Sequence, residues 1–340
     1  MLQKRIDIAI SPARFAANAF VNNFADSLVN RGFSVREFTW KKVPTAKTVI
    51  LHWPNDFFVN SGTRHLARCA IKLASMHIYR ATLGIRFVWV VHNLQPHDAG
   101  ALSPALSKVF LASLDGIIFL SEFSKEAIDQ LYGIPAGLKV LQTVHGNYRN
   151  NMILPVCGQK PITGNVQLLN FGQIRPYKNV DNLIETLAGM PDSGIDLMVA
   201  GCCYDADLLH RIKMIAHSSE NITLDARSEL LPDIDLERHI DNAHAVVLPY
   251  QKVLNSGAIF LALSRNRPVL APKMGSLPEL RAQVGSDWIM LYDGEMNEQV
   301  LYRFSGWLRQ RNPSATCDLS RFSWERIGED LSNFVKQLHE

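Results

Sequence analysis

The chain has 340 residues, of which 47% are hydrophobic and 20% are charged. At about 100–200 residues per domain, this length predicts two domains. The composition is that of ordinary globular proteins and excludes a disordered or fibrous chain. No apolar run approaches the roughly 18 residues of a membrane-spanning helix, and the opening MLQKRIDIAISPARF predicts a first β-strand rather than a signal peptide.

Charge is distributed unevenly along the chain. The formal net charge is only +3, but residues 1–150 hold 17 Lys and Arg against 9 Asp and Glu, a net charge of +8. The remaining residues hold 18 against 23, a net charge of −5. We therefore expect the first half to face an anionic partner.

The cysteines indicate a reducing compartment. There are five, an odd number, and none forms a C-x-x-C pair: Cys69, Cys157, Cys202, Cys203 and Cys317. A disulfide framework and a structural zinc site are both disfavoured by this pattern, and the cytoplasm fits it best.

Short apolar strands alternate with amphipathic helices through the first half. The predicted strands are Ile6–Ile10, Thr48–His52, Phe87–His92, Gly116–Leu120 and Lys139–Val144. The predicted helices lie near Ala16–Arg31, Arg64–Ala81, Pro104–Leu114 and Lys125–Tyr132. This alternation is typical of βαβ units that form a parallel sheet.

A second series of the same kind follows. Its predicted strands are Val166–Phe171, Asp196–Ala200, Ile222–Leu224, Ala245–Leu248 and Pro268–Leu270. Its predicted helices are Val180–Gly189, Ala206–Ser218, Leu236–Asn242 and Gly257–Leu263, and a last helix covers Ser323–Leu338.

Two such series predict an α/β protein of two Rossmann-like, doubly wound domains that face each other across a cleft. We expect a first domain over residues 1–155, a second over 156–320, and a terminal helix within 321–340 that can cross back to the first. The Pro- and Gly-containing segment around residues 150–164 marks the break. Because ligands bind at the carboxyl ends of parallel strands, functional side chains should directly follow strands.

A basic cluster follows the first strand of the second half. In FGQIRPYK, Gly172 allows a tight turn, and Arg175 and Lys178 place two cations just before a helix. A diphosphate needs this combination of positive charge, backbone amides and a helix N-terminus. The alternative is a basic loop on a solvated surface.

A polar loop, LPYQKVLNSG, leads into an apolar helix further along. Ser256 and Gly257 are typical of a helix start with amides ready for an anion, and Tyr250 and Asn255 are candidate contacts to the same ligand. The alternative is an N-capped helix with no further role.

Titratable groups gather where the strongest strand of the first half ends. The segment VHNLQPHD places His92, Asn93, His97 and Asp98 within seven residues. A metal site is disfavoured because Pro96 breaks the helix that would align ligands and no fourth ligand is evident. A general base or a site for a substrate hydroxyl fits better.

Other polar groups follow neighbouring strands of the first half. HWPND places an aromatic ring beside polar groups, as expected where a sugar ring stacks, although a core Trp before a turn has the same pattern. TVHGNYR ends the last strand, and Asn18 lies at the entrance of the first helix. The candidates from these segments are Asn18, His52, Trp53, Asp56, His145 and Tyr148.

Several motifs in this order resemble one group of enzymes. FGQIRPYKN and LPYQKVLNSGAIFLALSRNRPVLAP resemble the GT-B nucleotide-sugar glycosyltransferases. HWPND, VVHNLQPHD, TVHGNYRN, LPYQKVLNSG and DWIMLYDGE together resemble the bacterial exopolysaccharide β-mannosyltransferases of the xanthan-assembly type, over nearly the whole chain. The resemblance implies transfer of mannose from GDP-mannose, with inversion, to a lipid-diphosphate-linked oligosaccharide at the cytoplasmic face of the inner membrane.

The sequence also departs from the GT-B enzymes that retain configuration. Where many of those carry two glutamates eight positions apart, this chain has Val253 and Leu261, so the usual ribose-binding carboxylate is missing. Gln173 replaces the usual arginine after the first glycine, and the phosphate role passes to Arg175 and Lys178.

An inverting transfer needs a general base and stabilisation of the departing diphosphate. We expect Asp98 to be the base, with Asp56 as its rival and His97 as helper. The donor is assigned to Gly172, Arg175, Lys178, Tyr250, Asn255, Ser256 and Gly257. The acceptor is assigned to Asn18, His52, Trp53, His92, Asn93, His145 and Tyr148. No metal or other cofactor is expected, because cations and a helix terminus take that role in enzymes of this kind.

The partners expected are a nucleotide-sugar donor, a lipid-diphosphate-linked acceptor and an anionic membrane surface, with no nucleic acid. On Arg64–Arg80, basic residues recur every four positions among apolar ones, as in a helix that lies on a lipid surface. A solvated outer helix gives the same pattern. Three other functions stay open: a UDP-sugar transferase, a sugar-nucleotide epimerase on the same fold, and a sugar-binding scaffold subunit.

Overall fold

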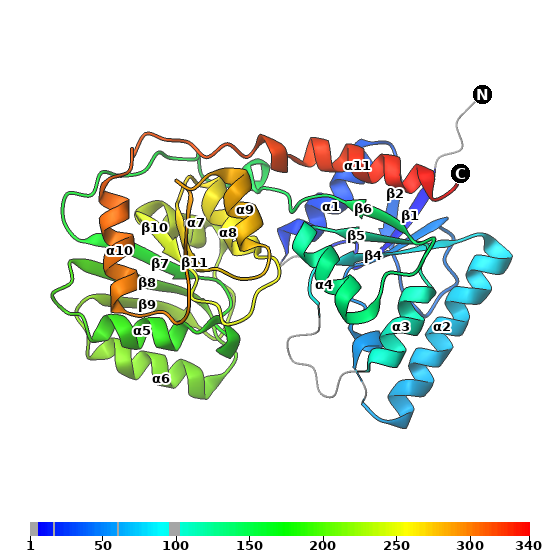
Figure 1. Cartoon of the computed structure of the whole chain (residues 1–340), viewed down its shortest axis with the longest axis horizontal. Helices are drawn as coiled ribbons and strands as arrows, with labels where there is room; N and C mark the ends of the chain where they lie inside the picture. The colour runs from blue at the N-terminus through cyan, green and yellow to red at the C-terminus, as the bar shows by residue number, and fades with distance from the viewer. Residues whose placement is uncertain (1–5, 16–17, 60, 95–102) are drawn as a thin grey trace. The chain divides into compact units, whose positions relative to one another are not determined.

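The computed structural model describes residues 6–15, 18–59, 61–94 and 103–340. It divides into two compact units, one formed by residues 1–146 with 321–340 and the other by residues 147–320 (Figure 1). Each unit contains a six-stranded sheet in which every strand pairing is parallel. The predicted α/β class is therefore confirmed.

The first sheet has the strand order β2-β1-β3-β4-β5-β6. Its strands are β1 (Asp7–Ser11), β2 (Ser34–Glu37), β3 (Thr48–Leu51), β4 (Arg86–Val91), β5 (Gly116–Phe119) and β6 (Lys139–Gln142). The sequence did not predict β2, an edge strand with no buried residue and therefore no apolar run to reveal it. The helices of this unit are α1 (Ala19–Asn30), α2 (Thr63–Leu83), α3 (Pro104–Ala112), α4 (Glu122–Tyr132) and α11 (Trp324–Gln337).

Alternation along β4 supplies both faces of this sheet. Val88 and Val90 face a core that includes α1 and α11. Trp89, on the opposite face, contacts Phe58 and Phe110 at ring-centroid distances of 5.0 and 6.0 Å. The continuous apolar strand thus serves a sheet covered on both sides.

The terminal helix α11 belongs to the first unit. Glycines allow two close approaches: a Cβ at Gly146 would lie 2.2 Å from the Trp324 ring, and one at Gly328 would lie 3.1 Å from the carbonyl oxygen of Ser27 on α1. Arg31, at the end of α1, donates a 2.6 Å hydrogen bond to the carbonyl of Glu325. The chain therefore returns after residue 320 to complete the core of the unit in which it began.

The second sheet has the strand order β12-β11-β10-β7-β8-β9. Its strands are β7 (Val166–Phe171), β8 (Ile195–Cys202), β9 (Ile222–Arg227), β10 (Ala245–Val247), β11 (Val269–Pro272) and β12 (Ile289–Tyr292). The helices are α5 (Val180–Ala188), α6 (Ala206–His217), α7 (Asp233–Asn242), α8 (Gly257–Ser264), α9 (Leu277–Val284) and α10 (Glu298–Arg309). The elements β12, α9 and α10 were not predicted.

Two arginines of the second unit have no exposed side-chain surface. Arg265 pairs with Glu237 at 3.0 Å and with Asp241, both on α7. Its guanidinium also donates to the carbonyls of Leu154 and Pro155. Burying a charge is costly unless it is paired and hydrogen-bonded, and this one is both.

The neighbouring Arg267 is satisfied by main-chain oxygens. It donates to the carbonyls of Ile240, Arg265 and Asp241 at 3.0, 2.8 and 2.9 Å. The two side chains together fix the end of α8, the helix α7 and the segment that enters the unit near residue 155.

A substitution of Glu237 tests the contribution of these buried ion pairs to stability. The carboxylate of Glu237 also accepts hydrogen bonds from the amides of Ile153 and Leu154 at 2.9 and 2.8 Å. Glu237→Ala should lower the free energy of unfolding by on the order of 3 kcal/mol, since it leaves a buried cation short of a partner. Denaturant unfolding followed by tryptophan fluorescence measures this loss.

The matched control is Asp181→Ala, which removes a surface ion pair with Arg211 (2.7 Å). It should cost less than about 1 kcal/mol. Equal effects of the two substitutions would contradict the role given to Glu237.

Candidate functional site

Two glycines bring the carboxyl ends of β7 and β8 together. Gly172 follows β7 with a φ of +102°, and its amide donates to the carbonyl of Ala200 at 3.0 Å. A Cβ at Gly201 would lie 1.9 Å from the carbonyl oxygen of Gly172. Only glycine fits at position 201, and the turn after β7 is held directly against β8.

This turn presents a buried cation, the ammonium of Lys178. Burial, and secondarily the charge of Arg175, lowers the pKa of Lys178 to about 8. Its Nζ lies 6.0 Å from the centre of the Tyr250 ring. Among the described residues no carboxylate pairs with Lys178. A desolvated ammonium without an anion favours an anionic ligand at this point.

The loop after β10 adds polar groups to the same edge. The hydroxyls of Tyr250 and Ser256 hydrogen-bond each other at 3.1 Å inside the protein. Ser256 occupies the N-cap position of α8, but its side chain does not cap the helix amides. Nδ2 of Asn255 is buried and has no hydrogen-bond partner among the described residues. The first turn of α8 therefore offers donors to an anion.

We call these residues the donor cluster: Gly172, Arg175, Lys178, Tyr250, Asn255, Ser256 and Gly257. The contacts between Lys178 and Tyr250 and between Tyr250 and Ser256 bring the two predicted motifs together, although more than 70 residues separate them in the chain. Chemically, the cluster can hold a diphosphate by ionic and amide contacts. The assignment of each residue to the donor stays a prediction.

Three histidines gather at the carboxyl edge of the first sheet, and we call them the histidine cluster: His52, His92 and His145. Nδ1 of His52 and Nε2 of His92 lie 2.8 Å apart, so one ring donates and the other accepts. Phe20 packs against His92 and His145 at centroid distances of 5.0 and 4.6 Å. The ring of Trp53 stacks on His92 at 4.8 Å.

Burial keeps these imidazoles uncharged. It lowers the pKa of His52 to about 3 and that of His145 to about 4. The pKa of His92 is also well below its ordinary value, because of burial and then of the two neighbouring histidines. At neutral pH the cluster can donate and accept hydrogen bonds without carrying charge, which suits contacts to sugar hydroxyls.

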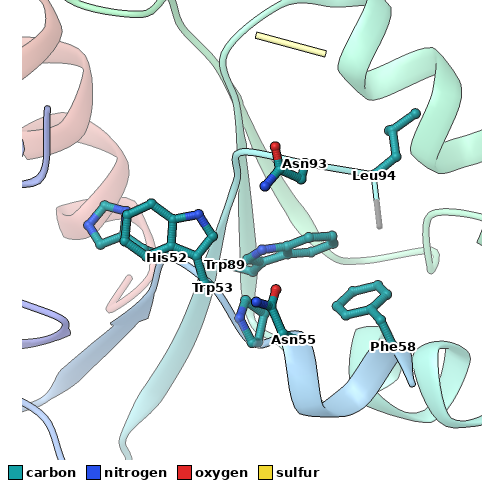
Figure 2. A pocket seen from close by; sticks show the side chains of 8 residues that line it. His52, Trp53, Asn55, Phe58, Trp89, Asn93 and Leu94 are labelled. Atoms are coloured by element: carbon teal, nitrogen blue, oxygen red, sulfur yellow. The ribbon is translucent and has the colours of Figure 1, made fainter. Parts of the chain in front are cut away.

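A small pocket opens beside the histidine cluster (Figure 2). In the view of Figure 2, His52 and Trp53 lie on one side and Trp89, Phe58 and Leu94 on the other. The complete lining is His52, Trp53, Pro54, Asn55, Phe58, Trp89, Asn93 and Leu94. Aromatic walls with a few amides suit contact with one face of a sugar ring, but the cavity itself is about 10 Å³, the space of about one water molecule.

Five of the eight lining residues were not among the predicted site residues: Pro54, Asn55, Phe58, Trp89 and Leu94. Phe58 and Trp89 look like ordinary core positions in sequence, and Asn55 looks like part of a turn. For Trp89, the alternation of side chains along the strand could have indicated its position. Val88 and Val90 face one side of the sheet, so Trp89 faces the other, where Phe58 lies.

The remaining acceptor predictions are more scattered. Asn18 caps α1, where its side chain accepts a 3.1 Å hydrogen bond from the amide of Phe20. Tyr148 lies in the second unit, where its amide donates to the hydroxyl of Ser264. It is therefore not part of the pocket beside the histidine cluster.

Of the residues predicted to act as or assist the general base, the structure describes only Asp56. The carboxylate of Asp56 is half exposed and forms an ion pair with Lys72 of α2. His97 and Asp98 lie outside the described residues. Within the described ranges, no group of three or more His, Cys, Asp or Glu is arranged to hold a metal ion.

Comparison with solved structures shows which fold these two sheets form. Sucrose-phosphate synthase from Thermosynechococcus elongatus matches with a TM-score of 0.62 and 15% identity, covering 98% of this chain and 99% of that one. Anabaena HepE in complex with UDP matches with a TM-score of 0.62 and 14% identity, covering 98% of each chain. The chain has the GT-B glycosyltransferase fold.

Sequence comparison adds a relative with a named activity. The chain is 28% identical over 307 residues to a GDP-mannose:glycolipid 4-beta-D-mannosyltransferase of Xanthomonas campestris pv. campestris, covering 89% of this chain and 82% of the relative. No protein-family model matches. The relative and the structural neighbours agree on the enzyme class expected from the sequence, a glycosyltransferase, and this expectation is confirmed.

Lys178 gives the donor cluster a pH dependence. A bound diphosphate holds Lys178 protonated, so binding is strongest below the lowered pKa of about 8 and weakens as the pH rises above it. Affinity for a nucleotide sugar should fall by up to about tenfold per pH unit above pH 8. Titration calorimetry from pH 7 to 9 measures this. Lys178→Met should weaken binding and flatten the profile, and a flat wild-type profile would contradict the assignment.

Gly201 tests the contact between the ends of β7 and β8. Gly201→Ala should displace the turn that carries Arg175 and Lys178 and weaken nucleotide binding by on the order of tenfold or more, because overpacking costs about 1–3 kcal/mol. Fluorescence or calorimetric titration with nucleotide provides the readout. The control is Gly306→Ala on α10, where a Cβ would meet no atom within 4 Å. Its nucleotide affinity should be unchanged, and equal losses in both variants would refute the steric account.

Proposed function

We propose that this protein transfers mannose from GDP-mannose to a lipid-diphosphate-linked oligosaccharide in bacterial exopolysaccharide assembly. The observation that carries the proposal is the donor cluster, where the buried cation Lys178 lies near the ring of Tyr250, whose hydroxyl bonds Ser256 at the start of α8. Such a site suits a leaving nucleoside diphosphate. The choice of mannose and of a glycolipid acceptor is supported by the activity for which the Xanthomonas relative is named.

The proposed reaction is a single displacement with inversion. The acceptor hydroxyl oxygen attacks the anomeric carbon, the bond from that carbon to the diphosphate oxygen breaks, and a general base takes the hydroxyl proton. Arg175 and Lys178 stabilise the charge that develops on the leaving diphosphate, so the proposal includes no metal ion. The absence of the paired glutamates, with Val253 and Leu261 in their places, supports inversion over retention.

We assign the general base to Asp98. Asp56 is the weaker candidate because its carboxylate already pairs with Lys72, and this ammonium competes for the oxygen that would accept a proton. His97 is proposed to assist. The neutral histidine cluster and the pocket with Trp53 and Asn93 are proposed to bind the acceptor sugar.

A glycolipid acceptor brings the reaction to a membrane surface. No helix in the described part of the chain is long and apolar enough to span a bilayer. We therefore propose peripheral attachment, at the cytoplasmic face of the inner membrane, with anionic lipid as the partner of the basic first half.

The donor assignment is tested by a thermal-shift panel of GDP and UDP sugars. A ligand that binds only the native state raises the unfolding midpoint by mass action. GDP-mannose should give the largest shift, and mannose should then appear in β linkage on a lipid-linked acceptor, as read by mass spectrometry and NMR. HepE was solved with UDP bound. A larger shift with a UDP sugar than with GDP-mannose would contradict the assignment of GDP-mannose as the donor.

Asp98→Asn separates binding from transfer. This variant should give the same thermal shift with GDP-mannose but lose nearly all turnover, because the base is missing while the donor cluster is intact. Conversion of the nucleotide sugar without any acceptor would instead indicate an epimerase. Near-normal transfer by the variant would reject Asp98 as the base.

A further inference from the structure

The helix α2 has two apolar faces, and only one of them is used in folding. Its inner face contributes the buried residues Cys69, Leu73 and Met76. On the opposite face, Ile71 and Ile78 are 67% and 57% exposed. A solvated helix normally carries polar residues where these two isoleucines lie.

The outward stripe continues along the helix at helical spacing. Alanines alternate with the two isoleucines in the order Ala67, Ile71, Ala74, Ile78 and Ala81, and all five are exposed. Steps of four and three residues place them on one side of the helix. At 1.5 Å per residue, the 21 residues of α2 form a rod about 31 Å long. Figure 1 shows α2 at the periphery of the first unit.

The charge on α2 is of one sign. Its 21 residues include no Asp or Glu. Of its cations, Lys72 and Arg80 pair with Asp56 and Asp115, whereas Arg64 and Arg68 form no ion pair with any described carboxylate. Arg64 and Arg68 flank the apolar stripe near the start of the helix.

The start of α2 lacks the side-chain cap and the acidic residues that usually stabilise a helix N-terminus. The N-cap is Gly62, which provides no side-chain cap, and the first turn holds no acidic residue to balance the helix dipole. Arg64, in the first turn, is repelled by the positive end of the helix dipole, and Arg68 follows one turn later on the same side of the helix. The conflict is relieved if the ends of these side chains contact anionic groups outside the chain.

We propose that the outer face of α2 is the surface that docks on the membrane, with Ile71 and Ile78 in the interfacial layer and Arg64 and Arg68 on anionic lipid headgroups. An apolar stripe flanked by arginines, with no acid, is the composition of helices that lie in a lipid interface. A second copy of this helix would bring cations against cations, which disfavours self-association.

This docking places the candidate acceptor pocket beside the lipid. The 3₁₀ turn Asn55–Phe58 supplies Asn55 and Phe58 to the pocket lining. The same turn contacts α2 through Asp56. Nε2 of His65 lies 2.9 Å from the carbonyl oxygen of Asp56, and Lys72 forms an ion pair with the carboxylate of Asp56. In this docking, α2 itself separates the turn from the lipid by one helix diameter, on the order of 10 Å. This part rests on the proposed function.

Vesicle co-sedimentation of the full chain tests the proposal, with pure phosphatidylcholine compared with mixtures containing phosphatidylglycerol. The wild type should bind the anionic vesicles. Ile71→Glu together with Ile78→Glu should reduce that binding by at least about tenfold, because carboxylates would replace exposed apolar groups. Arg64→Gln and Arg68→Gln should each reduce it by about fivefold.

The control variant carries Met214→Glu and Tyr302→Glu, at positions 60% and 50% exposed in the second unit. It should bind vesicles like the wild type. Equal binding by the α2 variant and the wild type, or no preference of the wild type for anionic lipid, would overturn the proposal. A lipid-free dimer that the α2 substitutions dissociate would also overturn it and assign the face to a second copy.

Two further readouts separate this proposal from the proposed function. The thermal shift with nucleotide sugar reports on the donor cluster and should be unchanged in the α2 variant. Transfer to a water-soluble, short-chain acceptor should also be retained, whereas transfer to acceptor embedded in vesicles should fall. Loss of both transfers in a variant that still binds nucleotide would overturn docking as the role of this face.

Discussion

The second unit depends on the complete burial of two positive charges. Arg265 and Arg267 leave water only because carboxylates of α7 and main-chain oxygens replace it. These contacts tie the last turn of α8 to α7 and to the entering chain. The first turn of α8 belongs to the donor cluster, so the ion pairs at one end of a short helix hold the amides at its other end in place.

The carboxyl edges of the two sheets differ in charge: one holds a buried cation and the other holds neutral histidines. The edge of the second sheet keeps an ammonium, Lys178, that no carboxylate in the described part of the chain pairs with, and burial makes that charge costly until an anion binds. The edge of the first sheet holds three imidazoles that burial keeps neutral. A charged diphosphate suits the first arrangement and an uncharged sugar suits the second, which is the division of labour that a sugar transfer requires.

Sequence patterns located most strands because buried parallel strands are continuous apolar runs, as at β4 and β7. They missed the edge strand β2, in which no residue is buried, and the helix α10, whose glycine and aromatic residues weaken helix propensity. The polar loops of both candidate sites were also found, because loops that follow such strands are recognisable by glycine, proline and charge. Trp89 and Phe58 were missed because a wall of a pocket and a core position have the same pattern.

The sequence by itself determined the two α/β series, the position of each polar loop after its strand, and the acid-free composition of α2, since all of these depend on neighbours within a few residues. Only the tertiary structure decided that His52 meets His92, that Lys178 loses its water beside Tyr250, and that Arg265 and Arg267 are wholly buried. It also decided which apolar face of α2 is covered and which is left exposed. Burial and pairing depend on residues distant in the chain, and a local pattern carries no information about them.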